Sequence, residues 1–153
     1  MGRHARPGAG RLVNLYVESS AVVAWLLGEQ PSAGKVRDLI KGAETVVSSE
    51  LTLVECDRVL IRAAATGRIG EAQAADRRAV LAKAAVCWHL VRLAGEVIER
   101  ARRPFPREPI RTLDALHLAS ALLVRSAVAG LEILSLDERV RENAKALGFR
   151  VYP

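Results

Sequence analysis

The stretch VNLYVESSAVVAWLLGE, residues 13–29, places an acid at the boundary between two expected elements. The run up to Val17 is apolar and β-rich, which predicts a buried strand over residues 12–17. SAVVAWLLG then repeats its apolar residues near helical spacing and ends at Gly28, a typical helix stop. An acid at the carboxyl end of a strand faces a crevice, and in open α/β sheets such crevices bind ligands. Glu18 is therefore the first candidate site residue.

The rest of the chain continues to alternate between strand-like and helix-like patterns. Further strands are expected at residues 45–49, 87–93, 131–136 and 149–152, and further helices at residues 32–42, 50–65, 71–85, 95–103, 112–126 and 137–148. The short sequence GRIG joins two of these helices, 50–65 and 71–85, into a predicted helical hairpin. Parallel strands need intervening crossovers, so this order predicts an α/β domain with a largely parallel sheet.

Apolar spacing also predicts the inward faces of three helices. The residues expected to point inward are Leu51, Val54 and Val59, then Val80 and Leu81, and then Leu113, Leu116, Ala119 or Ser120, and Leu123. Ser32 and Thr112 are expected to cap the helices that begin beside them.

The composition is that of a globular domain, and the net positive charge favours an anionic partner. The chain has 153 residues, of which 50% are hydrophobic, and a formal net charge of +6. Residues 1–11, rich in Gly, Pro and Arg, predict a flexible basic leader, and residues 12–153 predict one domain. No apolar run reaches the roughly 18 residues of a membrane span, so we expect a cytoplasmic protein without a membrane partner. Cys56 and Cys87 lack metal-site spacing and are expected to be free, buried thiols.

Four acids stand where the pattern expects element boundaries or apolar helices, namely Glu18, Glu55, Asp114 and Asp137. A carboxylate near a helix start can simply complement the helix dipole, which is an alternative for Asp114 and Asp137. A lone carboxylate on an inward stripe, as expected for Glu55, is costly unless it is paired. Acids that converge from distant segments repel one another, and a hard divalent cation relieves that repulsion.

These segments together resemble the PIN domain family, specifically the VapC-type toxin ribonucleases of bacterial toxin–antitoxin pairs. The family pattern of a strand followed by Asp-Ser/Thr-Ser-Ala is similar to Glu18-Ser-Ser-Ala in this chain, and SELTLVECDRVLIRA supplies the second acid. RTLDALHLASAL supplies the third acid and ILSLDERVRENAKALGFRVY the fourth. The resemblance covers nearly the whole chain and implies a three-layer α/β/α domain.

The resemblance also implies an activity. It implies hydrolysis of single-stranded or loop RNA with Mg²⁺ or Mn²⁺, the metal being held by Glu18, Asp114 and Asp137 while Glu55 completes the catalytic acids. Ser20 matches the family's small hydroxyl residue two positions after the first acid and could hydrogen-bond a carboxylate, a metal-bound water or the phosphate of the substrate. Arg111 precedes the helix of the third acid, where its planar group could receive a phosphate or pair with a carboxylate. Ser20, or more favourably Ser19, could instead cap the helix. A homodimer and a small antitoxin protein are the implied protein partners.

Several alternatives remain open from the sequence. The family carries aspartate where this chain has Glu18, so a domain that binds RNA or antitoxin without cutting is the second hypothesis. A phosphoacceptor site like that of response-regulator receivers is a third, but it requires a lysine at a late strand end, whereas Lys145 lies inside an expected helix. His117 invites a general-acid role, with buried packing as the favoured alternative. Trp25 and Trp88 could stack on bases, although packing is favoured for both.

Overall fold

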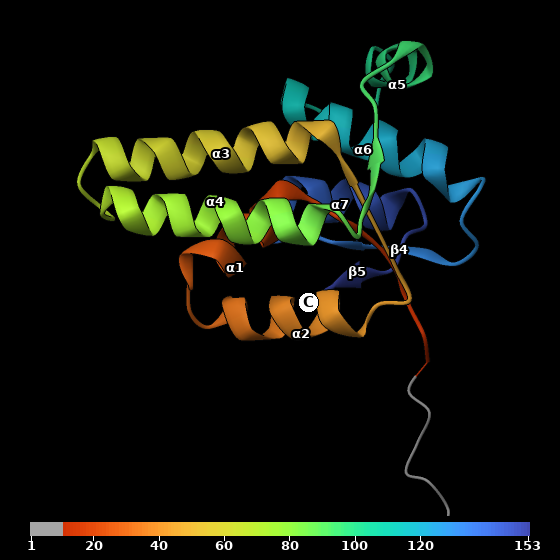
Figure 1. Cartoon of the computed structure of the whole chain (residues 1–153). Coiled ribbons are helices and arrows are strands. Elements are labelled where there is room, and N and C mark those ends of the chain that lie inside the picture. Colours follow the sequence, from red (N-terminus) through yellow and green to blue (C-terminus); the bar gives the residue numbers. More distant parts are fainter. Residues whose placement is uncertain (1–10) are drawn as a thin grey trace, which may run out of the picture.

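The computed structural model describes residues 11–153 (Figure 1). The elements are, in chain order, β1 (Asn14–Val17), α1 (Ser19–Leu27), α2 (Ser32–Gly42), β2 (Thr45–Ser49), α3 (Glu50–Ala65), α4 (Glu71–Ala85), β3 (His89–Val91), α5 (Gly95–Ala101), α6 (Thr112–Arg125), β4 (Leu131–Leu134), α7 (Glu138–Ala146) and β5 (Val151–Tyr152). Of the expected leader, residues 1–10 lie outside the described residues, and Arg11 forms an ion pair with Glu132.

The strands of the described residues form one parallel sheet in the order β3-β2-β1-β4-β5. Strand β1 is central and pairs with β2 on one side and with β4 on the other. The chain leaves β1 toward β2 and later returns to β4, so the strand order reverses on either side of β1. In open parallel sheets, ligands bind at the carboxyl ends of the strands where such a reversal occurs. The fold therefore directs attention to the residues that follow β1 and β4.

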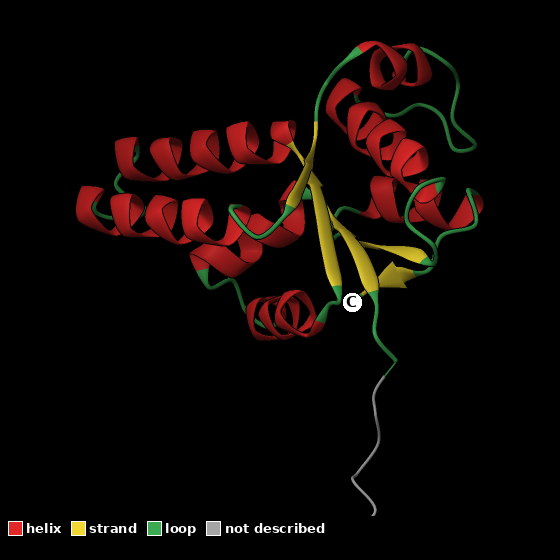
Figure 2. Ribbon diagram, turned by 45° about the vertical axis from the view of Figure 1, so that its right-hand side comes forward, coloured by secondary structure: helices red, strands yellow, loops and turns green. Residues whose placement is uncertain are grey.

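Helices cover both faces of this sheet (Figure 2). Side chains alternate across a strand, and in β1 this sends Leu15 and Val17 into one apolar cluster and Tyr16 into another. The first cluster packs beneath α1 to α4, and the second packs against α5, α6 and α7. The expected three-layer α/β/α arrangement follows from this alternation.

Helix positions agree well with the sequence pattern, while several inward faces were predicted wrongly. Val54, Val80 and Leu113 are 58%, 40% and 45% exposed, although each was expected to point inward. Leu51 and Leu81 are buried as expected. The buried face of α3 is formed by Leu51, Thr52, Cys56, Leu60 and Ala63. Apolar residues border the buried face of each helix on both sides. The spacing of apolar residues alone therefore placed the predicted buried stripe too far round the helix. Ser32 and Thr112 are the first helical residues, and neither capping position, Pro31 or Arg111, makes a side-chain capping bond.

The two cysteines are both free but differ in exposure. Cys56 is buried as expected, and burial raises the pKa of its thiol well above the usual value. Cys87 is exposed, because it lies in the turn between α4 and β3, so its predicted burial is wrong. Trp88 is buried and Trp25 half-buried in the cluster beneath α1 to α4, which supports the packing interpretation for both. No helix within residues 11–153 is long and apolar enough to cross a membrane.

Candidate active site

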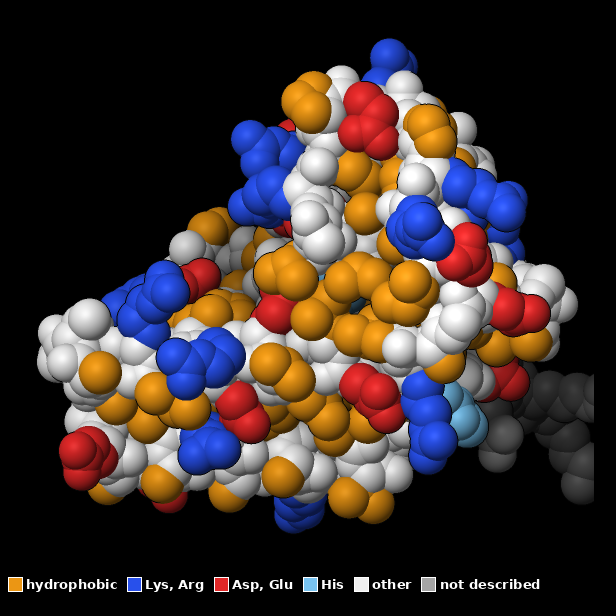
Figure 3. Space-filling view, turned by 90° about the horizontal axis from the view of Figure 1, so that it is seen from above, with side chains coloured by type: hydrophobic (Ala, Val, Ile, Leu, Met, Phe, Trp, Pro, Cys, Tyr) orange, Lys and Arg blue, Asp and Glu red, His pale blue; other side chains and the backbone are white. Residues whose placement is uncertain are grey.

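The four predicted acids share one pocket at the carboxyl edge of the sheet. The pocket has a volume of about 350 Å³ and is lined by Glu18, Ser19, Ser20, Val23, Glu55, Val59, Arg111, Thr112, Leu113, Asp114 and Asp137. Glu18 follows β1, Glu55 lies on α3, Asp114 on α6, and Asp137 precedes α7. Figure 3 views the molecule from this side and shows acidic side chains set among hydrophobic ones, with Lys and Arg around them. Four acids from four segments thus lie at one pocket.

Glu18 is buried and held by a cluster of hydroxyl groups. Its Oε1 accepts from Ser19 Oγ at 2.6 Å and from the Ser20 amide at 3.1 Å. Its Oε2 accepts from Ser20 Oγ and from Ser135 Oγ, the latter at 2.7 Å. A carboxylate offers about four acceptor positions, so all of them are in use. Glu18 is also the N-cap of α1, a role that the sequence favoured for Ser19.

The same hydroxyl groups fix the loop that carries Asp137. Ser20 Oγ accepts from the Leu136 and Asp137 amides at 2.8 and 3.2 Å. Ser135 Oγ also accepts from the Asp137 amide, at 3.1 Å. We name this arrangement of Glu18, Ser20 and Ser135 the serine clamp. It joins the end of β1 to the end of β4, and it leaves the Ser20 hydroxyl with its donor already committed.

Arg111 bridges the two aspartates of the pocket. Its Nε donates to Asp114 Oδ2 at 2.9 Å, and its Nη2 lies 3.3 Å from Asp114 Oδ1 and 2.6 Å from Asp137 Oδ2. The hydrogen bond to Asp114 is the main cause that raises the pKa of Arg111. The sequence had left open whether Arg111 pairs with a carboxylate, and the structure shows that it pairs with two.

Glu55 is oriented from behind by a buried histidine. His117 Nε2 lies 2.6 Å from Glu55 Oε1, and Tyr16 Oη lies 3.0 Å from His117 Nδ1. A carboxylate only accepts hydrogen bonds, so Nε2 is the donor to Glu55, and in the tautomer that carries its proton there Nδ1 accepts from the tyrosine. Burial raises the pKa of the Tyr16 phenol, which therefore keeps the proton it donates. His117 is 1% exposed and does not line the pocket, which disfavours the general-acid role.

The donor set matches the chemistry of a hard divalent cation, because all four acids present carboxylate oxygens. No three His, Cys, Asp or Glu side chains of the described residues are arranged as a ready metal centre. Hydroxyl groups occupy the Glu18 oxygens, and Arg111 bridges Asp114 and Asp137. The guanidinium of Arg111 is thus a cation that contacts two of the four carboxylates, and the charge and oxygen chemistry of the four acids are of the kind that a divalent cation prefers.

Sequence reasoning did not select Ser135 or Tyr16, and it assigned His117 no positioning role. Ser135 follows a strand and Tyr16 lies within one, so neither carries a local motif. Each acquires its role through a contact across more than 100 residues, from Ser135 to Glu18 and from Tyr16 to His117. Such contacts have no signal in one sequence.

The chain is similar to known proteins over most of its length. A model of the PIN domain family matches residues 15–146. Ribonuclease VapC46 of Mycobacterium tuberculosis is 33% identical over 137 residues, covering 90% of this chain and 95% of that protein. Ribonuclease VapC45 of the same species is 30% identical over 139 residues, covering 91% and 94%.

Solved structures of similar shape support the fold. The crystal structure of Mycobacterium tuberculosis VapC20, a toxin that cleaves the sarcin-ricin loop, aligns with a TM-score of 0.62 at 19% identity and covers 88% of this chain and 95% of that chain. A protein from Pyrobaculum aerophilum aligns with a TM-score of 0.56 at 21% identity, covering 91% and 83%. These likenesses concern the fold, and the expected three-layer domain is confirmed.

Proposed function

Because the chain belongs to the VapC branch of the PIN domain family, we propose that it is a metal-dependent endoribonuclease and the toxin of a toxin–antitoxin pair. The proposal rests chiefly on the convergence of Glu18, Glu55, Asp114 and Asp137 in one pocket. Similarity to proteins named ribonucleases supports RNA as the substrate. The proposed substrate is single-stranded or loop RNA, whose unstacked bases leave the backbone accessible.

In the proposed reaction, water attacks the phosphorus atom of a phosphodiester, the phosphorus–oxygen bond to one nucleotide breaks, and the departing oxygen takes a proton from solvent. Asp114 and Asp137 would hold Mg²⁺ or Mn²⁺, with Glu18 completing the metal-binding acids. Such an ion supplies a more acidic water and neutralises charge on the phosphate. Glu55, whose side chain is 23% exposed, faces the pocket and would accept the proton of the attacking water.

The remaining polar residues would bind or position. Arg111 would contact a phosphate oxygen, since its planar group suits bidentate contacts with phosphate. Ser20 was a candidate for substrate binding, but its hydroxyl donates to Glu18 and accepts from two amides. We therefore assign Ser20 to holding the pocket in shape. His117 orients Glu55 from outside the pocket.

The proposal includes protein partners and a location. A small antitoxin would cover the pocket, and the net charge of +6 would favour acidic segments of that partner. A homodimer in the cytoplasm completes the proposal, in keeping with the toxins that the sequence resembles.

The test is an RNA cleavage assay on purified, partner-free protein. Wild type should cleave a fluorescent RNA in Mg²⁺ or Mn²⁺, and EDTA should abolish cleavage. Asp114→Asn should lower the rate by at least about 100-fold, because it removes a proposed metal-binding charge. Asp57→Asn is the matched control, since Asp57 pairs with Arg78 at an exposed site away from the pocket. Intact RNA with both ions would refute the enzymatic proposal.

The serine clamp favours a second candidate, a domain that binds RNA or antitoxin without cutting. All four acceptor positions of Glu18 are taken by hydrogen bonds, so these bonds compete with a metal for its carboxylate. This candidate requires RNA retention in EDTA. Cleavage by the wild type would exclude it.

A further inference from the structure

Arg111 approaches its two aspartates from the open side of the pocket. The Asp114 and Asp137 side chains are 7% and 24% exposed, whereas that of Arg111 is 58% exposed. The aspartates are also fixed by helix starts, Asp114 in the first turn of α6 and Asp137 as the cap of α7. The acids are therefore the rigid part of this contact, and the arginine is the part that can leave.

The charges around the pocket give this contact its importance. Four acids line the pocket, and Arg111 is the one Lys or Arg among the described residues that line it. With the acids ionised, the arginine offsets one of four negative charges. An arginine side chain does not lose its proton in proteins. Arg111 therefore gives up this position by moving, and deprotonation is not a route.

A place for the displaced side chain lies next to the pocket. Arg111 and Thr112 also line a neighbouring cavity of about 530 Å³, formed between α5 and the start of α6. Its walls include Phe105 and Ile110, against which the aliphatic stem of an arginine can pack. Rotation of one exposed side chain would thus clear Asp114 and Asp137 without a change in the backbone.

We propose that Arg111 is a resident counter-cation that competes with the divalent metal for Asp114 and Asp137. The inference rests on the proposed function and adds a regulation of the same pocket. In the metal-free protein, Arg111 holds the two aspartates at a fixed separation and offsets their repulsion. When a divalent ion enters, Arg111 turns toward the neighbouring cavity and toward an incoming phosphate. The metal affinity of this protein is consequently lower than its four acids alone would give.

Manganese binding tests this competition without relying on activity. Titration of Mn²⁺ into the full chain, followed by the electron paramagnetic resonance signal of free Mn²⁺, gives a dissociation constant. Arg111→Gln should lower that constant by about two- to fivefold, a modest factor because an exposed ion pair is weak. Arg111→Lys should fall between the two, since lysine acts as a point charge without the bidentate fork.

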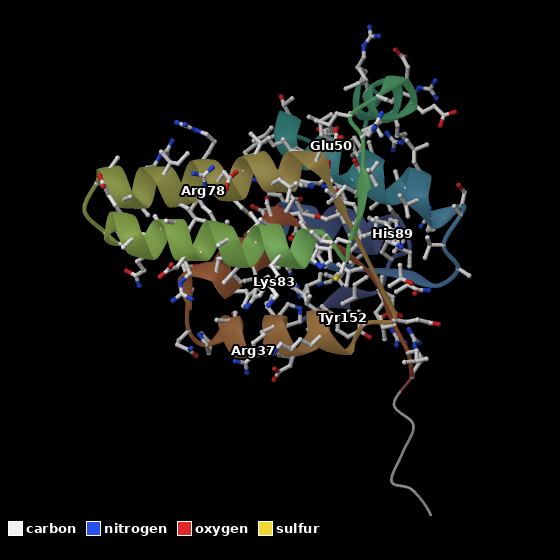
Figure 4. The ribbon with its side chains drawn as sticks, in the orientation of Figure 1. Arg37, Glu50, Arg78, Lys83, His89 and Tyr152 are labelled. Carbon is white, nitrogen blue, oxygen red and sulfur yellow. The ribbon has the colours of Figure 1, made fainter. Side chains whose placement is uncertain are left out.

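Arg78→Gln is the matched control, because Arg78 makes a similar two-bond contact with Asp57 on α3. Figure 4 shows Arg78 on α4, at the outer surface of the helical hairpin. Its Mn²⁺ dissociation constant should equal that of wild type. Arg111→Gln should also weaken RNA binding in EDTA, so metal and RNA affinities should change in opposite directions. A general loosening of the pocket would weaken both.

The outcomes separate this inference from the proposed function. If wild type binds Mn²⁺ and cleaves RNA but Arg111→Gln and Arg111→Lys bind Mn²⁺ no tighter, the competition is refuted and the nuclease stands. If no variant binds Mn²⁺ and wild type leaves RNA intact, both proposals fall.

Discussion

The hydrogen bond from Tyr16 to His117 can be removed by deleting one oxygen atom. In Tyr16→Phe the ring stays in the core, but His117 Nδ1 becomes a buried acceptor without its partner. Leaving such a group unpaired costs about 1–3 kcal/mol, so we expect a loss near 2 kcal/mol. At about 2–4 °C per kcal/mol for a domain of this size, the melting temperature should fall by roughly 4–8 °C. Urea unfolding measures the first value and calorimetry the second.

The same substitution should slow RNA cleavage, because His117 would no longer be held with its Nε2 proton toward Glu55. Loss of an outer partner of this kind typically costs about tenfold or more. Tyr152→Phe is the control, since Tyr152 lies in β5 (Figure 4) and its hydrogen bonds with Ser135 and Arg141 use its backbone oxygen, which the substitution keeps. Equal stability and equal cleavage rates in the two variants would show that the tyrosine does not position His117.

Three further results are expected. Glu18→Asp should lower the free energy of unfolding in urea by about 1–2 kcal/mol, because the shorter arm can keep the Ser20 amide but not reach Ser135; unchanged stability would contradict the serine clamp. Above pH about 10, where unfolded tyrosines ionise, stability should fall as pH rises, because burial keeps Tyr16 protonated in the folded state. This slope reaches about 1.4 kcal/mol per pH unit, and urea midpoints of Tyr16→Phe should show less of it. A thiol reagent should modify Cys87 in the native protein but Cys56 only after unfolding, as mass spectrometry of digests can check.

The parts of the fold that were predicted correctly are those that depend on residues close together in the sequence. Helix α4 spans Glu71–Ala85, the range that its alanine-rich composition indicated. The acids were also found from local context, since each follows a strand or interrupts an apolar helix. Faces of helices were harder, because Val54 and Leu113 border the buried stripe and one step of 100° decides their exposure.

The interior of the site could not be predicted, since its contacts join distant segments. The sequence separation is 101 residues between Tyr16 and His117, and 62 between His117 and Glu55. Arg111 is different, because its contact with Asp114 spans a single helical turn and was among the alternatives considered. Its second contact, with Asp137, depended on the tertiary fold.

The serine clamp ties the end of the first strand to Ser135, a residue 117 positions further along. A ribosome must therefore make most of the polypeptide before the pocket can assemble. During that interval the nascent chain carries its first acids without the loop that completes them. If the protein is the toxin proposed above, the nascent chain cannot cleave RNA during synthesis, because the residues that complete the pocket are added late.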